Sequence, residues 1–154
     1  MAWAFLATAR GPWCHAWQGT AADLADEVRA LERQAPAGPR LRWLRGGRLR
    51  TKAGLLEEWA AAGQFPPYFG GTWDAFRDAL AELPEAGAAY FVLEADQLLA
   101  GAPPQEAATL AAILQEVAAE VEDRPFHVVF QAEPARYGTL LEGVRALGLG
   151  VDEV

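Results

Sequence analysis

Three carboxylates in one short segment have the spacing and chemistry to form a functional surface. Asp74, Asp78 and Glu82 follow an i, i+4, i+8 pattern, which places them on one face of a helix. An acid in the first turn suits the helix dipole, and this explains Asp74 but not Asp78. A solvated helix face is the simplest interpretation. The alternative is a surface that attracts a basic partner, because exposed acids steer cations toward a protein.

The segment before these acids favours the second interpretation. Residues 64–83 read QFPPYFGGTWDAFRDALAEL, in which prolines and glycines favour an irregular loop and Thr72 is placed to cap the helix that follows. Tyr68 and Phe69 lie in this loop, beside two glycines and ahead of the acidic face. Aromatic anchors beside charges are typical of protein interfaces. The helix buries its other face through Trp73, Phe76, Leu80 and Leu83.

The same segment resembles the signature of a known family. Its pattern is Pro66-x-Tyr68-Phe69-Gly70-x-x-Trp73-Asp74-Ala75-Phe76-x-Asp78. This resembles barstar, the intracellular inhibitor of the ribonuclease barnase. The resemblance implies an α/β fold, with a small parallel β-sheet packed by helices, over about residues 40–131. Residues 1–39 would be an N-terminal extension of strands plus a helix, and residues 132–154 a C-terminal helix and strand, all in one compact unit.

The resemblance also implies a function and a set of partner-binding residues. In that family the loop and the following helix plug the active site of a basic, extracellular-type ribonuclease, and their acids take the place of substrate phosphate. The positions carried over to this chain are Tyr68, Phe69, Gly70, Asp74, Arg77, Asp78 and Glu116. Thr72 and Arg77 depart from the family pattern, and Arg77 would bring positive charge toward a basic cleft. The alternative is therefore a protein-interaction module on the same fold with a non-nuclease partner.

Composition narrows the class of protein. The chain has 154 residues, 52% of them hydrophobic, which suits one domain with a sizeable core. Its net charge of −8 argues against general nucleic-acid binding. The charge is uneven, because residues 1–52 hold nine Lys/Arg and four Asp/Glu (+5), and the remainder holds four and seventeen (−13). The single cysteine, Cys14, excludes an intramolecular disulfide, and no segment is long enough to span a membrane. We expect a cytoplasmic protein.

Hydrophobic periodicity predicts the order of elements. Two short strands are expected within residues 2–17, and helices at 21–34 and 51–62. The breaker at residues 35–39 separates the first helix from a strand at 40–44. The signature helix is followed by a buried strand at 88–93, a helical turn at 95–99 and a long helix from 103 to about 122. A strand at 126–131, a helix at 135–146 and a strand at 149–154 complete the chain.

Other chemistry has little support. Cys14 and His15 are neighbours on a predicted strand and therefore point to opposite faces, and His127 lies in an apolar strand as a structural histidine. The chain has no metal-ligand spacing and no phosphate-binding loop, so we expect no cofactor, no metal and no enzymatic activity. Two further hypotheses are a small-ligand site at the strand ends and nucleic-acid binding through the basic segment 40–52.

Overall fold

The computed structural model describes residues 3–66 and 69–154. The strands are β1 (Cys14–Gln18), β2 (Arg40–Arg45), β3 (Ala88–Leu93), β4 (Phe126–Ala132) and β5 (Asp152–Glu153). The helices are α1 (Ala21–Gln34), α2 (Lys52–Gly63), α3 (Trp73–Ala81), α4 (Pro104–Glu120) and α5 (Pro134–Ala146). Short 3₁₀ turns are η1 (Ala4–Ala7), η2 (Gly46–Arg48) and η3 (Ala95–Gln97). The protein is α/β, as the sequence predicts.

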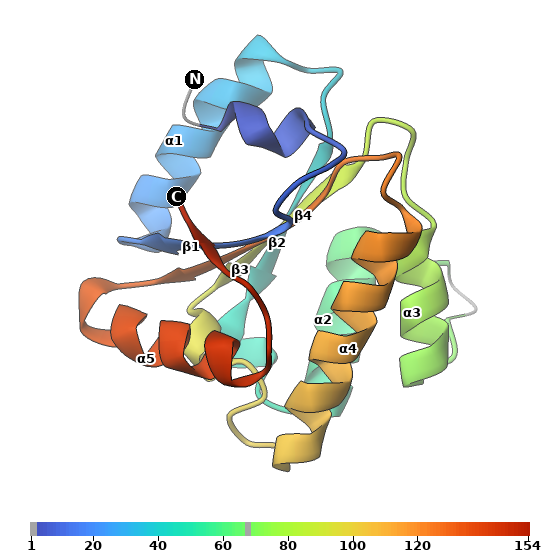
Figure 1. Ribbon diagram of the computed structural model, residues 1–154, viewed down its shortest axis with the longest axis vertical. Coiled ribbons are helices and arrows are strands. Elements are labelled where there is room, and N and C mark those ends of the chain that lie inside the picture. The colour runs from blue at the N-terminus through green and yellow to red at the C-terminus, as the bar shows by residue number, and fades with distance from the viewer. Residues whose placement is uncertain (1–2, 67–68) are drawn as a thin grey trace.

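The strands form one parallel sheet in the order β2-β3-β4-β1-β5. Strand β1 pairs with β4 over its whole length, from Cys14 opposite Val128 to Gln18 opposite Ala132. The first strand of the chain therefore lies inside the sheet, between β4 and β5 (Figure 1). Strands β2 and β5 form the two edges.

Both faces of the sheet are covered, which explains the apolar runs in its strands. All seven residues of β4 are buried, as expected of a parallel strand with helices on either side. A large core cluster joins one face of the sheet to α2, α3, α4 and α5. A smaller cluster on the other face joins Phe91 and Val129 to Leu24 and Val28 of α1 and to Leu6 of η1. Figure 1 shows α1 and α5 on opposite sides of β1.

Threonines begin three of the helices, and this local chemistry is readable from the sequence. The hydroxyls of Thr20, Thr51 and Thr72 each accept a hydrogen bond from the amide three residues later, at 3.1 Å in each case. Each bond satisfies one of the amide groups that a helix leaves free at its start.

The segment before β1 differs from the expectation of two strands. Among the described residues of this segment, from Trp3 on, Cys14–Gln18 alone forms a strand. The predicted strand within residues 2–9 is wrong there, and the 3₁₀ turn η1 stands in its place. In a strand, successive apolar side chains would point to alternate faces, but here they pack with the spacing of a helical turn. Trp3 and Leu6, one helical turn apart, are both buried against the same face of the sheet. In the described residues, no helix is both long and apolar enough to cross a membrane.

Gly46, at the end of β2, allows close contact with the turn that follows β3. A Cβ atom at this position would lie 2.2 Å from the Glu94 carbonyl oxygen and 2.3 Å from that of Leu93. These are backbone atoms, so a methyl group would force the two segments apart. At Gly47, next along the chain, a Cβ atom would meet nothing within 4 Å.

We expect Gly46→Ala to lower the free energy of unfolding by about 1–3 kcal/mol, the usual range for overpacking a tight site. Gly47→Ala serves as the matched control and should change stability little. Urea unfolding followed by tryptophan fluorescence measures both. Equal stability of the two variants would contradict the proposed close contact.

Candidate functional site

Helix α3 is fixed in the core by its aromatic face and by its neighbour α4. Phe76 and Leu80 are buried, and the Phe76 ring packs edge-on against Trp59 of α2 at 5.2 Å between centroids. The indole nitrogen of Trp73 donates a hydrogen bond to Glu106 of α4 at 2.9 Å. Because the buried side of α3 is held in this way, its acidic side faces outward.

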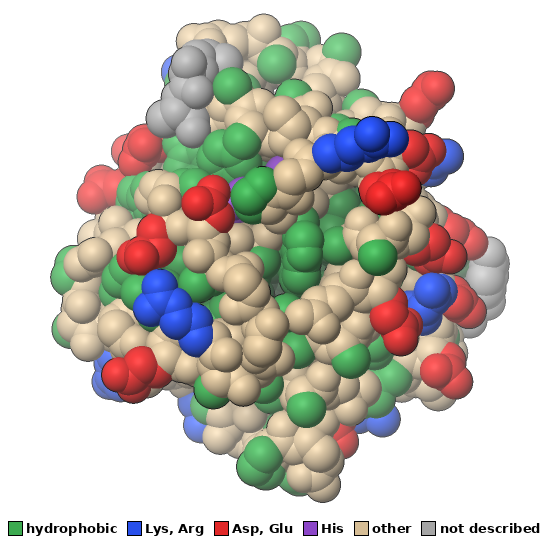
Figure 2. All heavy atoms as spheres, viewed as in Figure 1, with side chains coloured by type: hydrophobic (Ala, Val, Ile, Leu, Met, Phe, Trp, Pro, Cys, Tyr) green, Lys and Arg blue, Asp and Glu red, His purple; other side chains and the backbone are tan. Residues whose placement is uncertain are grey.

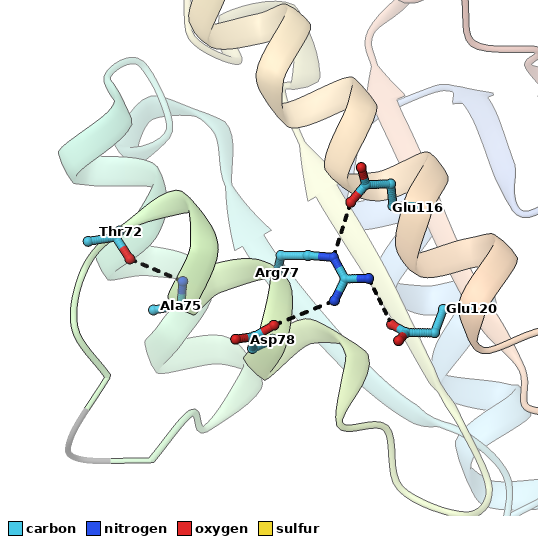
Figure 3. A network of polar contacts seen from close by, with 6 residues as sticks. All are labelled: Thr72, Ala75, Arg77, Asp78, Glu116 and Glu120. Carbon is cyan, nitrogen blue, oxygen red and sulfur yellow. Dashed lines mark hydrogen bonds and ion pairs between the residues drawn. The ribbon is translucent and has the colours of Figure 1, made fainter.

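Arg77 connects the acidic side of α3 to α4. Its guanidinium donates to Glu116 at 3.1 Å and lies 3.2 Å from a carboxylate oxygen of Glu120. A weaker contact of 3.5 Å joins it to Asp78, the next residue on α3. Figure 3 shows the three carboxylates converging on this one side chain from two helices. Arg77, which the sequence analysis places among the partner-binding residues, thus forms its ion pairs within the chain.

The carboxylates in this network remain open to solvent. The Asp78, Glu116 and Glu120 side chains are 75%, 61% and 50% exposed, whereas Arg77 is 32% exposed. The hydrogen bond to Glu116 and the attraction of Glu120 raise the pKa of Arg77, so it stays a cation. Three carboxylates share one positive charge and keep acceptor positions that face outward. We call Asp78, Glu116 and Glu120 the acidic triad.

A cleft of about 190 Å³ lies beside the triad, between α3 and the loop that precedes it, which contributes Pro66, Phe69 and Gly70. Phe69 and Pro66 form part of its apolar wall, and Asp78 and Glu82 add carboxylates. An aromatic wall beside acids suits a long cationic side chain, whose stem is apolar and whose head is charged.

The other sequence-predicted residues lie around the same surface. Asp74 is exposed in the first turn of α3, and Gly70 lines the cleft. Tyr68 lies outside the described residues. Glu116, assigned through the family resemblance, and Asp78 both form ion pairs with Arg77. The sequence reasoning missed Glu120, although it follows Glu116 by four residues and therefore shares its helix face.

The small-ligand hypothesis expects a polar pocket at the ends of the parallel strands. Around Gln131, at the ends of β3 and β1, the described residues form no such pocket. This buried side chain accepts a hydrogen bond from the Glu94 amide at 2.8 Å and donates one to the Gly19 carbonyl at 2.7 Å. It therefore occupies the position between the ends of β3 and β1. Only Gly19 and Thr20 separate β1 from α1, too few residues for a phosphate-binding loop.

An apolar pocket of about 250 Å³ opens between α4 and α5. Leu110 and Leu114 of α4 face Leu140 and Val144 of α5 across it, with Phe130 of β4 among its lining residues. Figure 2 shows this hollow as a patch of hydrophobic side chains. Such a lining offers shape but few polar groups. No group of three His, Cys, Asp or Glu residues suited to a metal ion occurs in the described part of the chain.

The basic segment is partly used inside the fold. Arg45 forms a bidentate ion pair with Glu58 of α2, with N–O distances of 3.0 and 3.1 Å, and the same carboxylate accepts a bond from the Arg45 amide. Arg45 holds the pKa of Glu58 below its usual range. This pair fastens the end of edge strand β2 to α2.

The comparisons with known proteins agree with part of this description. The family model described as Barstar (barnase inhibitor) matches residues 40–131. The chain belongs to the barstar family. No curated protein matches it significantly.

Solved structures that share the fold come from other proteins. The crystal structure of Cdc6p from Pyrobaculum aerophilum aligns with 94% of this chain at 21% identity and a TM-score of 0.56. The structure of Drosophila ORC bound to GC-rich DNA and Cdc6 aligns with 94% of the chain at 14% identity and a TM-score of 0.50. This chain covers 40% and 50% of those chains, so the likeness concerns the fold alone.

These findings overturn the expected ribonuclease-inhibitor function. The barstar match is a domain-level match to residues 40–131, whereas the structures that align with nearly the whole chain are those of Cdc6 and ORC. The geometry of α3 differs from the expectation as well. Asp78 and Glu116, two of the acids expected to contact the nuclease, are already paired with Arg77 of the same chain.

We expect Arg77→Gln to lower the free energy of unfolding, because the acidic triad loses its shared cation and its members repel one another. The loss should shrink when salt screens the repulsion. Urea unfolding at low and high ionic strength measures this. Glu120→Gln in the Arg77→Gln background should restore part of the stability, and a loss independent of salt would contradict the electrostatic explanation.

Proposed function

We propose that this chain is a non-catalytic protein-interaction module of the cytoplasm, whose partner is a non-nuclease protein with a basic surface. The observation that carries the proposal is the acidic triad, in which one guanidinium holds exposed carboxylates from two helices in fixed positions. A partner gains more from groups that are already ordered, because less conformational entropy is lost on binding.

The charge of the surface supports a basic partner. Arg77 cancels one of the three negative charges of the triad. Two more exposed acids lie nearby, Asp74 in the first turn of α3 and Glu82 just after its end. Charge complementarity of this kind raises the rate of association and selects against acidic partners. Arginine or lysine side chains of the partner would meet carboxylate positions that Arg77 leaves unused.

The cleft supplies the second half of the site. A partner's arginine or lysine could lay its stem along Phe69 and place its charged head near Asp78 and Glu82, which line the same cleft. An aromatic wall and a carboxylate together favour a cation over an apolar side chain. The site therefore combines a broad acidic surface with one specific position.

We expect zero-length carbodiimide crosslinking in native lysate to join Asp78 or Glu116 to lysines of a basic protein. The triple variant Asp78→Asn/Glu116→Gln/Glu120→Gln should lose that protein, and salt should weaken its retention. Mass spectrometry of the crosslinked peptides identifies both the partner and the point of contact.

The control is a triple variant on α1, Asp23→Asn/Asp26→Asn/Glu32→Gln, which removes the same charge from exposed positions across the sheet. It should retain the partner. Equal retention by the wild type and by the triad variant would refute the proposed surface.

A further inference from the structure

Two buried histidines form a hydrogen-bond chain on the α1 side of the sheet. His15 of β1 lies opposite Val129 of β4, and its side chain reaches diagonally to His127, with His15 Nε2 2.9 Å from His127 Nδ1. His127 Nε2 is 2.9 Å from the Thr8 carbonyl oxygen. At the other end, His15 Nδ1 is 3.5 Å from a carboxylate oxygen of Asp152 in β5. The side chains of His15 and His127 are almost completely buried.

The Thr8 carbonyl fixes the direction of the whole chain. A carbonyl oxygen can only accept, so His127 must carry its proton on Nε2. A neutral His127 then has a bare Nδ1, which accepts a hydrogen bond from the Nε2–H group of His15. His15, if neutral, is left with a bare Nδ1, and this atom has no hydrogen-bond partner in the described residues. It faces a carboxylate oxygen of Asp152 at 3.5 Å, and a carboxylate oxygen is a hydrogen-bond acceptor as well.

We propose that Asp152, His15, His127 and the Thr8 carbonyl form a directional hydrogen-bond chain that lacks one donor, at the contact where His15 Nδ1 faces the Asp152 carboxylate. When a proton binds there, Asp152 and His15 Nδ1 change from two facing acceptors into a charge-assisted hydrogen bond. No other proton in the chain has to move.

The surroundings determine when the proton binds. Burial, followed by the neighbouring His127, lowers the pKa of His15 to about 4, against the attraction of Asp152 and the Pro12 carbonyl. From η1, the uncharged ring of Phe5 packs on His15 at 4.4 Å. From α1, apolar residues cover this face, and Glu27 of that helix accepts a hydrogen bond from Trp3. His15 is therefore neutral at neutral pH, with its proton on Nε2 and none on Nδ1.

Strand β5 has a second attachment on the opposite face, which does not depend on this proton. Glu153 accepts a hydrogen bond from the Tyr137 hydroxyl at 2.9 Å and lies 3.5 Å from Arg145, both on α5. The side chain of Glu153 thus joins β5 to α5, whereas the side chain of Asp152 faces His15 without a hydrogen bond between them.

Nitrogen-15 NMR of the two imidazoles tests the direction of the chain. At pH 8 we expect both rings to be neutral with the proton on Nε2, and His15 Nδ1 to be the first ring nitrogen protonated on acidification. A proton on His15 Nδ1 at pH 8, as in an ordinary His–Asp ion pair, would overturn the proposal.

Asp152→Asn supplies the missing donor, because its amide nitrogen can donate to His15 Nδ1. At pH 8 we expect this variant to have a folding equilibrium constant about two- to tenfold above that of Asp152→Ala, the range for one added hydrogen bond. Glu153→Gln, on the other face of β5, should not be more stable than the wild type, because Glu153 already accepts a hydrogen bond from Tyr137. An Asn variant no more stable than the Ala variant would contradict the missing donor.

The pH dependence of stability has a definite sign. Because the pKa of His15 falls from about 6.5 in the unfolded chain to about 4 in the native protein, its contribution is complete above about pH 6.5 and is lost as pH falls toward 4. We expect the urea midpoint to drop through this window, and to drop less in His15→Gln. The remainder comes from His127, whose pKa burial also lowers. An unchanged drop in His15→Gln would contradict the assignment.

Discussion

The structure depends on the complete burial of β4 between two layers of helices. Every one of its seven residues is shielded from solvent, so the sheet needs apolar cover on both faces. The large cluster with α2, α3, α4 and α5 supplies one cover, and α1 with η1 supplies the other. Strand β1 completes the arrangement by pairing with β4 along its whole length. The segment before residue 40 is thus part of the sheet on which the barstar-family region is built.

The acidic surface on α3 and α4 follows from this core. The aromatic side of α3 is committed to the core, with Phe76 against Trp59, so α3 has only its acidic side left to face outward. Arg77 then joins that side to α4. A single arginine has two effects here, because it lowers the net charge of the surface and also holds the remaining carboxylates in place. The second effect gives the carboxylates of α3 and α4 fixed positions relative to one another.

Most of the buried polar side chains in the sheet have hydrogen-bond partners for all of their polar atoms. Gln131 satisfies both ends of its amide through backbone groups of two neighbouring segments, and His127 satisfies both of its nitrogens. His15 is the exception, with one nitrogen facing a carboxylate instead of a donor. A buried polar atom without a partner is costly, so such an exception in a well-packed protein calls for an explanation.

The sequence by itself determined most elements and the surface residues that share a helix. Threonine caps, proline and glycine breaks and the 3.6-residue period are local signals, and they located every helix to within a few residues. They also placed Asp74 and Asp78 on the exposed side of α3. The strand that the sequence predicts at residues 2–9 is wrong for the described residues from Trp3 on, because short apolar runs fit a strand and a buried turn equally well.

Only the tertiary structure decided the contacts between distant segments. The pairing of Arg77 with Glu116 and Glu120 depends on how α3 packs on α4, and no spacing along the chain encodes that angle. The same holds for the insertion of β1 between β4 and β5, which alone brings His15, His127 and Asp152 together. Residue types and local periods fix what a segment can form. Which segments become neighbours is decided by the burial of both sheet faces at once, a property of the whole chain.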